Sequence, residues 1–571
     1  MLTTRTAVRP GPSGRAPPAH QGPLDGLRAA AAGAVLLTHV GGLTGYTLTG
    51  TPASWVFSRG DVGVPIFFSL SGLLLYRRWA TAALTGGQAG AVAVYLRRRA
   101  LRILPAYWAV VLIALPVLNR GAARHAWPWV QYLLLIQNYD SHPWWSGTGA
   151  TGLAQAWSLV VEVSFYLILP FLAAALTWFA CRGTTAGDVS RRARRLLIGI
   201  AALAASSAGW EVLGYYPHPS LWSEGTLPPV LIWFCTGMAM AVALAWAAAE
   251  PGPGSSAGSD GITGAENPGG VAALTASTDA PAGQFCRSVA ASAGMCGLIA
   301  ACAFAIACTP LTGPEFAGVP GLWATEFKTV LYALIAAAVV APVAFQPLLG
   351  RHATGMLSAR LLGSRPVRFL GQISYGIFLW QFLAAYAFFG LLHRNTVFAG
   401  GSYTTPEVAA IAVAIALLTV AAAAMSYYLI EGPAQRLRIS GLSRRLAAAR
   451  IWLRADERGG QPGDDDQADD LGNPVYQPER DRAIVAAQHE MLASHARGRS
   501  GEQQARRQPG TSDPGTGQPR SGQPWPGRAE PWPGRAEPGP AGAPGGDQEP
   551  GRGHGQDGRP WVPAQPEPGQ R

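Results

Sequence analysis

The sequence is poor in charge. Only 13% of its 571 residues are Asp, Glu, Lys or Arg, whereas a soluble globular chain carries roughly 25%. So few charges cannot cover the surface of several soluble domains, and the hydrophobic residues, 49% of the chain, come in long blocks. These features exclude an ordinary soluble enzyme and a wholly disordered chain, and they predict a polytopic membrane protein.

Lysine is almost absent and cysteine is sparse. Lys328 is the only lysine, so nearly every cation is an arginine. The six cysteines form no CxxC pair and show no zinc-ligand spacing. Most lie in apolar blocks, where a free thiol behaves as a small hydrophobe. We therefore expect no metal site, and the cysteines indicate no redox compartment.

The apolar blocks predict an all-α fold, a bundle of about ten transmembrane helices. A spanning helix needs about 20 apolar residues. The stretch from Trp129 to Tyr139 is too short and is interpreted as re-entrant or interfacial, inside an outer loop of residues 119–153. The expected spans are roughly 28–46, 62–76, 104–119, 155–180, 195–213, 227–248, 287–308, 329–348, 367–391 and 407–430.

Charge is distributed unevenly along the chain. The first 450 residues hold 30 basic and 15 acidic groups, whereas residues 451–571 hold 14 arginines and 18 acids. The basic excess forms short clusters beside apolar blocks, which predicts a cell-membrane protein with both termini in the cytoplasm. Such clusters also suit lipid head groups. Nucleic acid is not an expected partner, because no basic face interleaved with aromatics accompanies them.

Composition divides the chain into three parts. Residues 1–22 are a disordered N-terminal segment, and residues 23–450 are the transmembrane domain, with a flexible linker at 249–284. Residues 451–571 are rich in Pro, Gly and Arg and include a tandem Pro-Trp-Pro-Gly-Arg-Ala-Glu repeat. This tail cannot bury enough apolar surface to offset its ordering entropy, so we expect it to be disordered and cytoplasmic.

Arg28 and His39 share the first predicted span. Eleven positions correspond to about 16 Å of helical rise and close to three turns, so both side chains lie near one face. Arg28 is expected at the cytoplasmic mouth and His39 near the bilayer midplane. An ionisable residue at that depth is a functional candidate. The alternative is a neutral histidine bonded to a neighbouring carbonyl.

Glu162 is one of very few acids inside a predicted span. It enters the fourth span from the outer side and lies about two turns into the membrane. An unpaired carboxylate there is costly, so Glu162 needs a cation, a donor or a raised pKa. Because His39 reaches a similar depth from the opposite end, we expect the two to form a His–carboxylate pair that faces one cavity, as general base catalysis requires. The alternative is a structural Glu bonded to its own helix.

Six stretches of the chain carry a recognisable pattern: Leu24–Arg28 with His39, Gly63–Gly72, Arg98–Trp108, Trp157–Tyr166, Ile373–Trp380 and Tyr428–Pro433. Taken in order, they resemble the motifs of the membrane acyltransferase 3 family. Each is weak alone, but six in the right order are specific, and they cover about residues 22–438. Two positions depart from the family pattern: Pro65 replaces a polar residue, and Gln381, which cannot take a proton at neutral pH, replaces a frequent His.

The resemblance implies His-assisted O-acylation with acyl-CoA as co-substrate, no bound cofactor, and a carbohydrate or glycoconjugate hydroxyl as acceptor. Acetyl is the family's commonest cargo. His39 and Glu162 are the expected catalytic residues. Guanidinium groups bind phosphates bidentately, although the same arginines could simply set topology. The expected acyl-CoA and substrate contacts are Arg28, Arg98, Arg99, Arg102, Trp157, Ser158 and Tyr375, of which the last three could instead be packing residues.

Two other classes of function remain open from the sequence. A proton-coupled transporter or flippase of an envelope precursor would use midplane His and Glu residues, but it predicts an internal repeat, and the two halves show no convincing similarity. A membrane sensor would use the C-terminal tail to recruit partners.

Overall fold

A computed structural model of the protein describes residues 22–436 apart from 146, 148, 186, 216–224, 250–280, 315–320 and 350–356. Within this part the chain forms helices and no strands, which confirms the predicted all-α fold. The predicted disorder of the N-terminal segment before Gly22, of most of the linker and of the tail concerns residues outside the described part. The linker is shorter than predicted, because residues 281–284 already belong to a helix.

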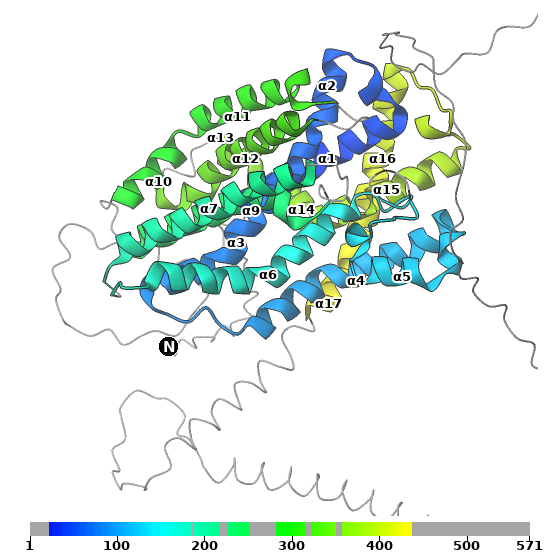
Figure 1. The fold of residues 1–571 in the computed structure, drawn as a ribbon. Coiled ribbons are helices and arrows are strands. Elements are labelled where there is room, and N and C mark those ends of the chain that lie inside the picture. The colour runs from blue at the N-terminus through cyan, green and yellow to red at the C-terminus, as the bar shows by residue number, and fades with distance from the viewer. Residues whose placement is uncertain are drawn as a thin grey trace, which may run out of the picture. The chain divides into compact units, whose positions relative to one another are not determined.

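The helices pack together as a bundle, shown in Figure 1. The first half contains α1 (Gly22–Thr44), α2 (Pro52–Ser58), α3 (Gly63–Thr85), α4 (Val92–Leu118), α5 (Ala126–Leu133), α6 (Ala156–Cys181) and α7 (Val189–Tyr215). The second half contains α9 (Leu227–Ala249), α10 (Pro281–Ala291), α11 (Ala293–Ala307), α12 (Leu322–Phe345), α13 (Leu357–Leu362), α14 (Arg365–Gln372), α15 (Ser374–Leu391), α16 (Thr405–Ser426) and α17 (Gly432–Arg436).

Among the described residues, eight helices are long and apolar enough to cross a membrane, or nine if α10 and α11, bent by 67°, form one span. The remaining predicted block, at 62–76, is helical too and forms α3, where Arg77 and Arg78 interrupt the apolar sequence. The short stretch from Trp129 to Tyr139 is divided between α5, which ends at Leu133, and a 3-10 turn at Gln137–Tyr139, so it forms no helix long enough to span a membrane. The chain is therefore a multi-pass membrane protein.

The core centres on α3, which packs most extensively against α9 and also contacts α6. Phe234 of α9 stacks on Phe68 of α3 at 4.4 Å and on Phe165 of α6 at 4.0 Å between ring centroids. Gly237 lets the backbones of α3 and α9 approach, because a Cβ at this position would lie 1.8 Å from the Ser69 carbonyl oxygen. Small residues at crossings are the usual device for close packing of membrane helices.

Two ends of the bundle differ in chemistry. The arginine end, where α3 finishes and α4 begins, carries Arg77 and Arg78 and the cluster of residues 97–102. The opposite end carries α2, α5 and the short 3-10 helix η3 (Arg59–Val62), which packs on α1 and leads into α3. Because α3 connects the two ends, it positions polar groups at both.

Candidate active site

A cavity opens between α1, α3, α4, α6 and α15. It encloses about 790 Å³ of empty space, counting its open mouth. Phe67 and Phe378 supply part of its apolar wall. Of the nine side chains predicted as site residues, six line it, drawn from four helices: Arg28, Arg99, Arg102, Ser158, Glu162 and Tyr375.

Glu162 is the acid in the cavity wall. One of its carboxylate oxygens, Oε1, accepts a hydrogen bond from the Ser71 hydroxyl at 2.8 Å and another from the Tyr166 hydroxyl. Tyr166 lies one turn further along α6 and Ser71 lies on α3. Oε2 has no hydrogen-bond partner among the described side chains. The carboxylate is thus held by neutral donors on one oxygen, and its other oxygen is available to a ligand.

Three guanidinium groups share this cavity with Glu162. Arg28 is paired with Asp25 at 2.7 Å, and Arg99 lies over the Tyr166 ring, with its Cζ 5.9 Å from the centroid. Arg102 interacts electrostatically with Arg28, which it repels. No described arginine forms an ion pair with Glu162. Cations therefore exceed acids along the wall, which suits an anionic ligand.

Two polar residues of the wall are fixed by the backbone. The Tyr375 hydroxyl donates to the Ile103 carbonyl at 2.9 Å and so ties α15 to α4. The Ser158 hydroxyl donates to the Gln155 carbonyl at 3.3 Å. Both side chains line the cavity, but their hydroxyl protons are already used, so they can only accept hydrogen bonds from a ligand.

His39 does not line the cavity, so the predicted pairing of His39 with Glu162 is not found. The imidazole packs against Phe382 of α15, with ring centroids 4.5 Å apart and the ring planes tilted by 40°, and lies beside Gln381. Its Nδ1 is buried and has no hydrogen-bond partner. Position along α1 follows from the sequence, but the packing around α1 does not: Phe382 of α15 covers the imidazole that was expected to face Glu162.

Arg98 and Trp157 also lie outside the cavity wall. Arg98 is exposed at the arginine end. Trp157 is half-buried and packs against the main core, while its carbonyl accepts from Asn138 Nδ2 at 2.9 Å. These positions favour packing for Trp157. They leave a role at the mouth of the cavity for Arg98.

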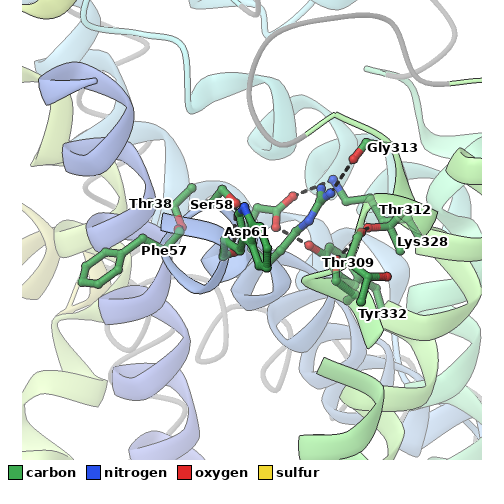
Figure 2. A network of polar contacts seen from close by, with 12 residues as sticks. Thr38, Phe57, Ser58, Asp61, Thr309, Thr312, Gly313, Lys328 and Tyr332 are labelled. Carbon is green, nitrogen blue, oxygen red and sulfur yellow. Dashed lines mark hydrogen bonds and ion pairs between the residues drawn. The ribbon is translucent and has the colours of Figure 1, made fainter. Parts of the chain in front are cut away.

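A second polar cluster, not expected from the sequence, lies at the start of α3 (Figure 2). Asp61 pairs with Lys328 of α12 at 2.8 Å and accepts a hydrogen bond from the Tyr332 hydroxyl. Arg59, 1% exposed, donates to the Gly313 carbonyl at 2.7 Å. Two charges just before an apolar block, together with the only lysine of the chain, were the available signals. Ser71 and Tyr166 were missed too, although Tyr166 is four residues after Glu162 on one helix face.

The family comparison agrees with this arrangement. The model of the acyltransferase 3 family, described as an acyltransferase domain, matches residues 23–427. No curated protein and no solved structure matches the chain. The match spans every helix that contributes to the cavity, and it favours an acyltransferase over a transporter or a sensor. The chain therefore belongs to the acyltransferase 3 family.

Proposed function

We propose that the protein is an O-acyltransferase that moves an acyl group, most simply acetyl, from acyl-CoA to a hydroxyl of a carbohydrate or glycoconjugate. The observation that carries this proposal is the cavity in which Glu162 lies among Arg28, Arg99 and Arg102. The family supplies the reaction class. The carbohydrate acceptor follows from the resemblance of the motifs and is the part that most needs testing.

The cavity wall fits an acyl-CoA in two respects. Guanidinium groups form strong charge-assisted hydrogen bonds with phosphates, and the Phe67 and Phe378 side chains offer apolar contact for an acyl chain. Positive residues favour the cytoplasmic side of a membrane. We therefore place the arginine end in the cytoplasm, where acyl-CoA is available, with the protein in the cell membrane and both termini inside.

The transfer needs a base and a route for the leaving thiolate. The acceptor oxygen attacks the thioester carbonyl, the base takes the hydroxyl proton, the carbon–sulfur bond breaks, and the CoA thiolate leaves and is protonated. For an acceptor inside the cavity, Glu162 is the group in reach, because its Oε2 is unpaired there. Positioned base catalysis contributes roughly 10²–10⁴-fold.

His39 is the second candidate base, as the motif resemblance implies. It lies about 16 Å of helical rise beyond Arg28 and presents an unpartnered Nδ1. We propose that it serves an acceptor that approaches from the end of the bundle opposite the arginines. Glu162 and His39 thus belong to different approaches of the acceptor, which separate variants distinguish.

Membranes containing the full chain, incubated with acetyl-labelled acetyl-CoA, provide the test. We expect wild type to place label in carbohydrate as an ester released by mild base. Glu162→Gln is expected to lower transfer about 100-fold or more. Asp61→Asn is the matched control, because it removes a carboxylate charge outside the cavity. Loss of transfer in His39→Ala but not in Glu162→Gln would assign the base to His39 and Glu162 to structure.

Wild-type protein that neither binds nor consumes acyl-CoA would overturn the proposal as a whole. Label found in lipid or protein, with none in carbohydrate, would keep the acyltransferase but overturn the acceptor. Movement of an unacylated precursor across the membrane in the absence of acyl-CoA would favour the transporter.

A further inference from the structure

Arg78 lies beyond the cavity, near the arginine end of α3, and its surroundings are unusual. Its guanidinium carbon is 3.9 Å from the ring centroid of Trp79 and 4.7 Å from that of Tyr95. The two rings meet edge to face, 5.1 Å apart, and both residues are buried. Cation–π contacts with the two rings hold the guanidinium group in place. Its in-plane N–H groups are not used by such contacts.

Several donors in this group have no partner. Nε and Nη2 of Arg78, Nε of Arg99 and the hydroxyl of Tyr95 are buried and make no hydrogen bond among the described residues. Buried polar groups in native proteins are almost always hydrogen-bonded. Four unsatisfied donors of one small group therefore indicate a missing acceptor.

The charges point in the same direction. Arg98 and Arg99 lie close enough to Arg78 to repel it. Neither Arg78 nor Arg99 forms an ion pair with a carboxylate in the described part of the chain. A bound anion would offset the repulsion between these two guanidinium groups. A planar guanidinium group suits a phosphate, because two parallel N–H groups match two phosphate oxygens.

The group continues the line of the cavity. Arg78 lies seven positions after Ser71, a distance of about two helical turns. Both residues therefore lie on the same face of α3, about 10 Å apart along its axis. On α4, Tyr95 is one turn from Arg99, which lines the cavity. From Glu162 outward, the order is thus Tyr166 with Arg99, and then Tyr95 with Arg78.

We propose that Arg78, Arg99 and the Tyr95 hydroxyl form a phosphate-binding subsite that holds the nucleotide end of the acyl donor. The inference rests on the proposed function, since it assigns this outer group to the same donor whose thioester enters the cavity. The ligand is long, with its phosphates at one end and its reactive carbon at the other. An outer group of phosphate donors and an inner carboxylate in the cavity wall match that polarity.

Equilibrium binding to the purified full-length protein tests the subsite without knowledge of the acceptor. The probes are labelled acetyl-CoA, acetyl-dephospho-CoA, which lacks only the 3′-phosphate, and acetyl-pantetheine, which lacks the nucleotide. We expect Arg78→Gln to weaken acetyl-CoA binding about 10- to 100-fold and to leave acetyl-pantetheine binding unchanged. Tyr95→Phe should weaken acetyl-CoA binding by a few-fold. Arg77→Gln, a neighbouring arginine that does not line the cavity, is the matched control and should change neither.

The pattern across probes decides the outcome. Unchanged acetyl-pantetheine binding shows that Arg78→Gln is folded, and equal affinity of the variant for acetyl-CoA and acetyl-pantetheine supports the subsite. Equal weakening of both probes, or of neither, overturns it. A lipid result would also overturn the subsite. In that case phosphatidylglycerol binds to wild type and not to Arg78→Gln, but it does not displace acetyl-CoA from either protein. Failure of wild type to bind any probe would instead overturn the proposed function.

Discussion

The two polar clusters along α3 differ in how their carboxylates are satisfied. At the start of the helix, both oxygens of Asp61 are occupied, one by the Lys328 ammonium group at 2.8 Å and the other by the Tyr332 hydroxyl. In the middle of the helix, Ser71 and Tyr166 hold one oxygen of Glu162, and the other faces the cavity unpaired. The first cluster is closed and the second is open.

This difference separates architecture from chemistry. A carboxylate with all of its acceptors used has no capacity left for a substrate, and its partners tie η3 to α12. A carboxylate with a free oxygen, in a wall where arginines outnumber acids, is costly to maintain. Such a group is expected where a ligand completes it. We therefore assign Asp61 to holding the bundle together and Glu162 to the reaction.

The change expected to break this comparison most severely is Gly237→Ala. The new Cβ would lie 1.8 Å from the Ser69 carbonyl oxygen and 2.6 Å from the Leu73 backbone nitrogen, so α3 and α9 would have to separate. Overpacking of this kind costs about 1–3 kcal/mol, occasionally more. Because α3 positions both clusters, we expect lower thermal stability in detergent together with loss of donor binding. Gly294→Ala in α11, where nothing lies within 4 Å of the new atom, is the control. Equal stability of the two variants would contradict the close approach.

Asp61→Ala should affect stability alone. Removing the carboxylate leaves the buried Tyr332 hydroxyl without its acceptor and Lys328 without its counter-ion. An unsatisfied buried group costs about 1–3 kcal/mol, whereas the ion pair itself adds little, since its side chains are 30% and 36% exposed. We expect a lower free energy of unfolding with unchanged affinity for acetyl-CoA. A selective loss of donor affinity would place Asp61 in the site.

The sequence predicted the fold well and the lateral arrangement of the site poorly. Each apolar block became helical, because length and hydropathy are properties of the block itself. The breaks were not predicted: block 287–308 is divided between α10 and α11, and block 367–391 between α14 and α15. Position along a helix also follows from the sequence, and Arg28 and Glu162, both predicted as site residues, line the cavity. Which helices are neighbours does not follow from it. The packing of Phe382 against His39 depends on residues more than 340 positions apart in the chain.

The Asp61 cluster shows the same limit. Its partner Lys328 is remote in sequence, and no local pattern links an acid before the second span to a lysine in a later one. By contrast, the hydrogen bond from Tyr166 to Glu162 joins residues four apart on one helix and could have been predicted from i, i+4 spacing. Local contacts were thus within reach of the sequence, and contacts between distant helices were not.

Ser71→Ala sharpens the comparison from the side of the open cluster. It removes one of the two donors that hold Glu162, and a hydrogen bond to a charged group is worth about 1.5–3 kcal/mol. Because Tyr166 still donates to the same oxygen, the carboxylate loses orientation rather than its place. We expect roughly tenfold slower acyl transfer, which corresponds to about 1.4 kcal/mol, with unfolding unchanged. Ser69→Ala, on the same helix but outside the cavity wall, is the control. Equal effects of the two serine variants on transfer would show that Ser71 has no specific role in the reaction.

The smallest effect is expected at a third carboxylate, Asp140, in the connection between α5 and α6. Like Asp61 it is satisfied on both oxygens, but by neutral donors: the His142 backbone N–H at 2.9 Å and the Gln131 amide. The N–H of His142 and the Gln131 amide lower the pKa of Asp140 below its ordinary 3.8. A lowered pKa in the folded protein means that the carboxylate stabilises the loop above pH 3.8, and that this contribution is lost as the pH falls through the folded value.

Gln131 also accepts a hydrogen bond from Trp144 Nε1 at 3.0 Å, so the ring reports on Asp140. In protein labelled with 5-fluorotryptophan, the ¹⁹F resonance of Trp144, assigned through Trp144→Phe, should titrate with a midpoint below pH 3.8. Asp140→Asn should abolish that titration and leave acyl transfer at neutral pH unaltered, whereas Asp188→Asn, at another carboxylate with a lowered pKa, should preserve it. A titration of Trp144 that survives in Asp140→Asn would show that the loop carboxylate does not control its neighbours. Hydrogen bonds from neutral donors, unlike the ion pair of Asp61, would then not hold the neighbouring side chains in place.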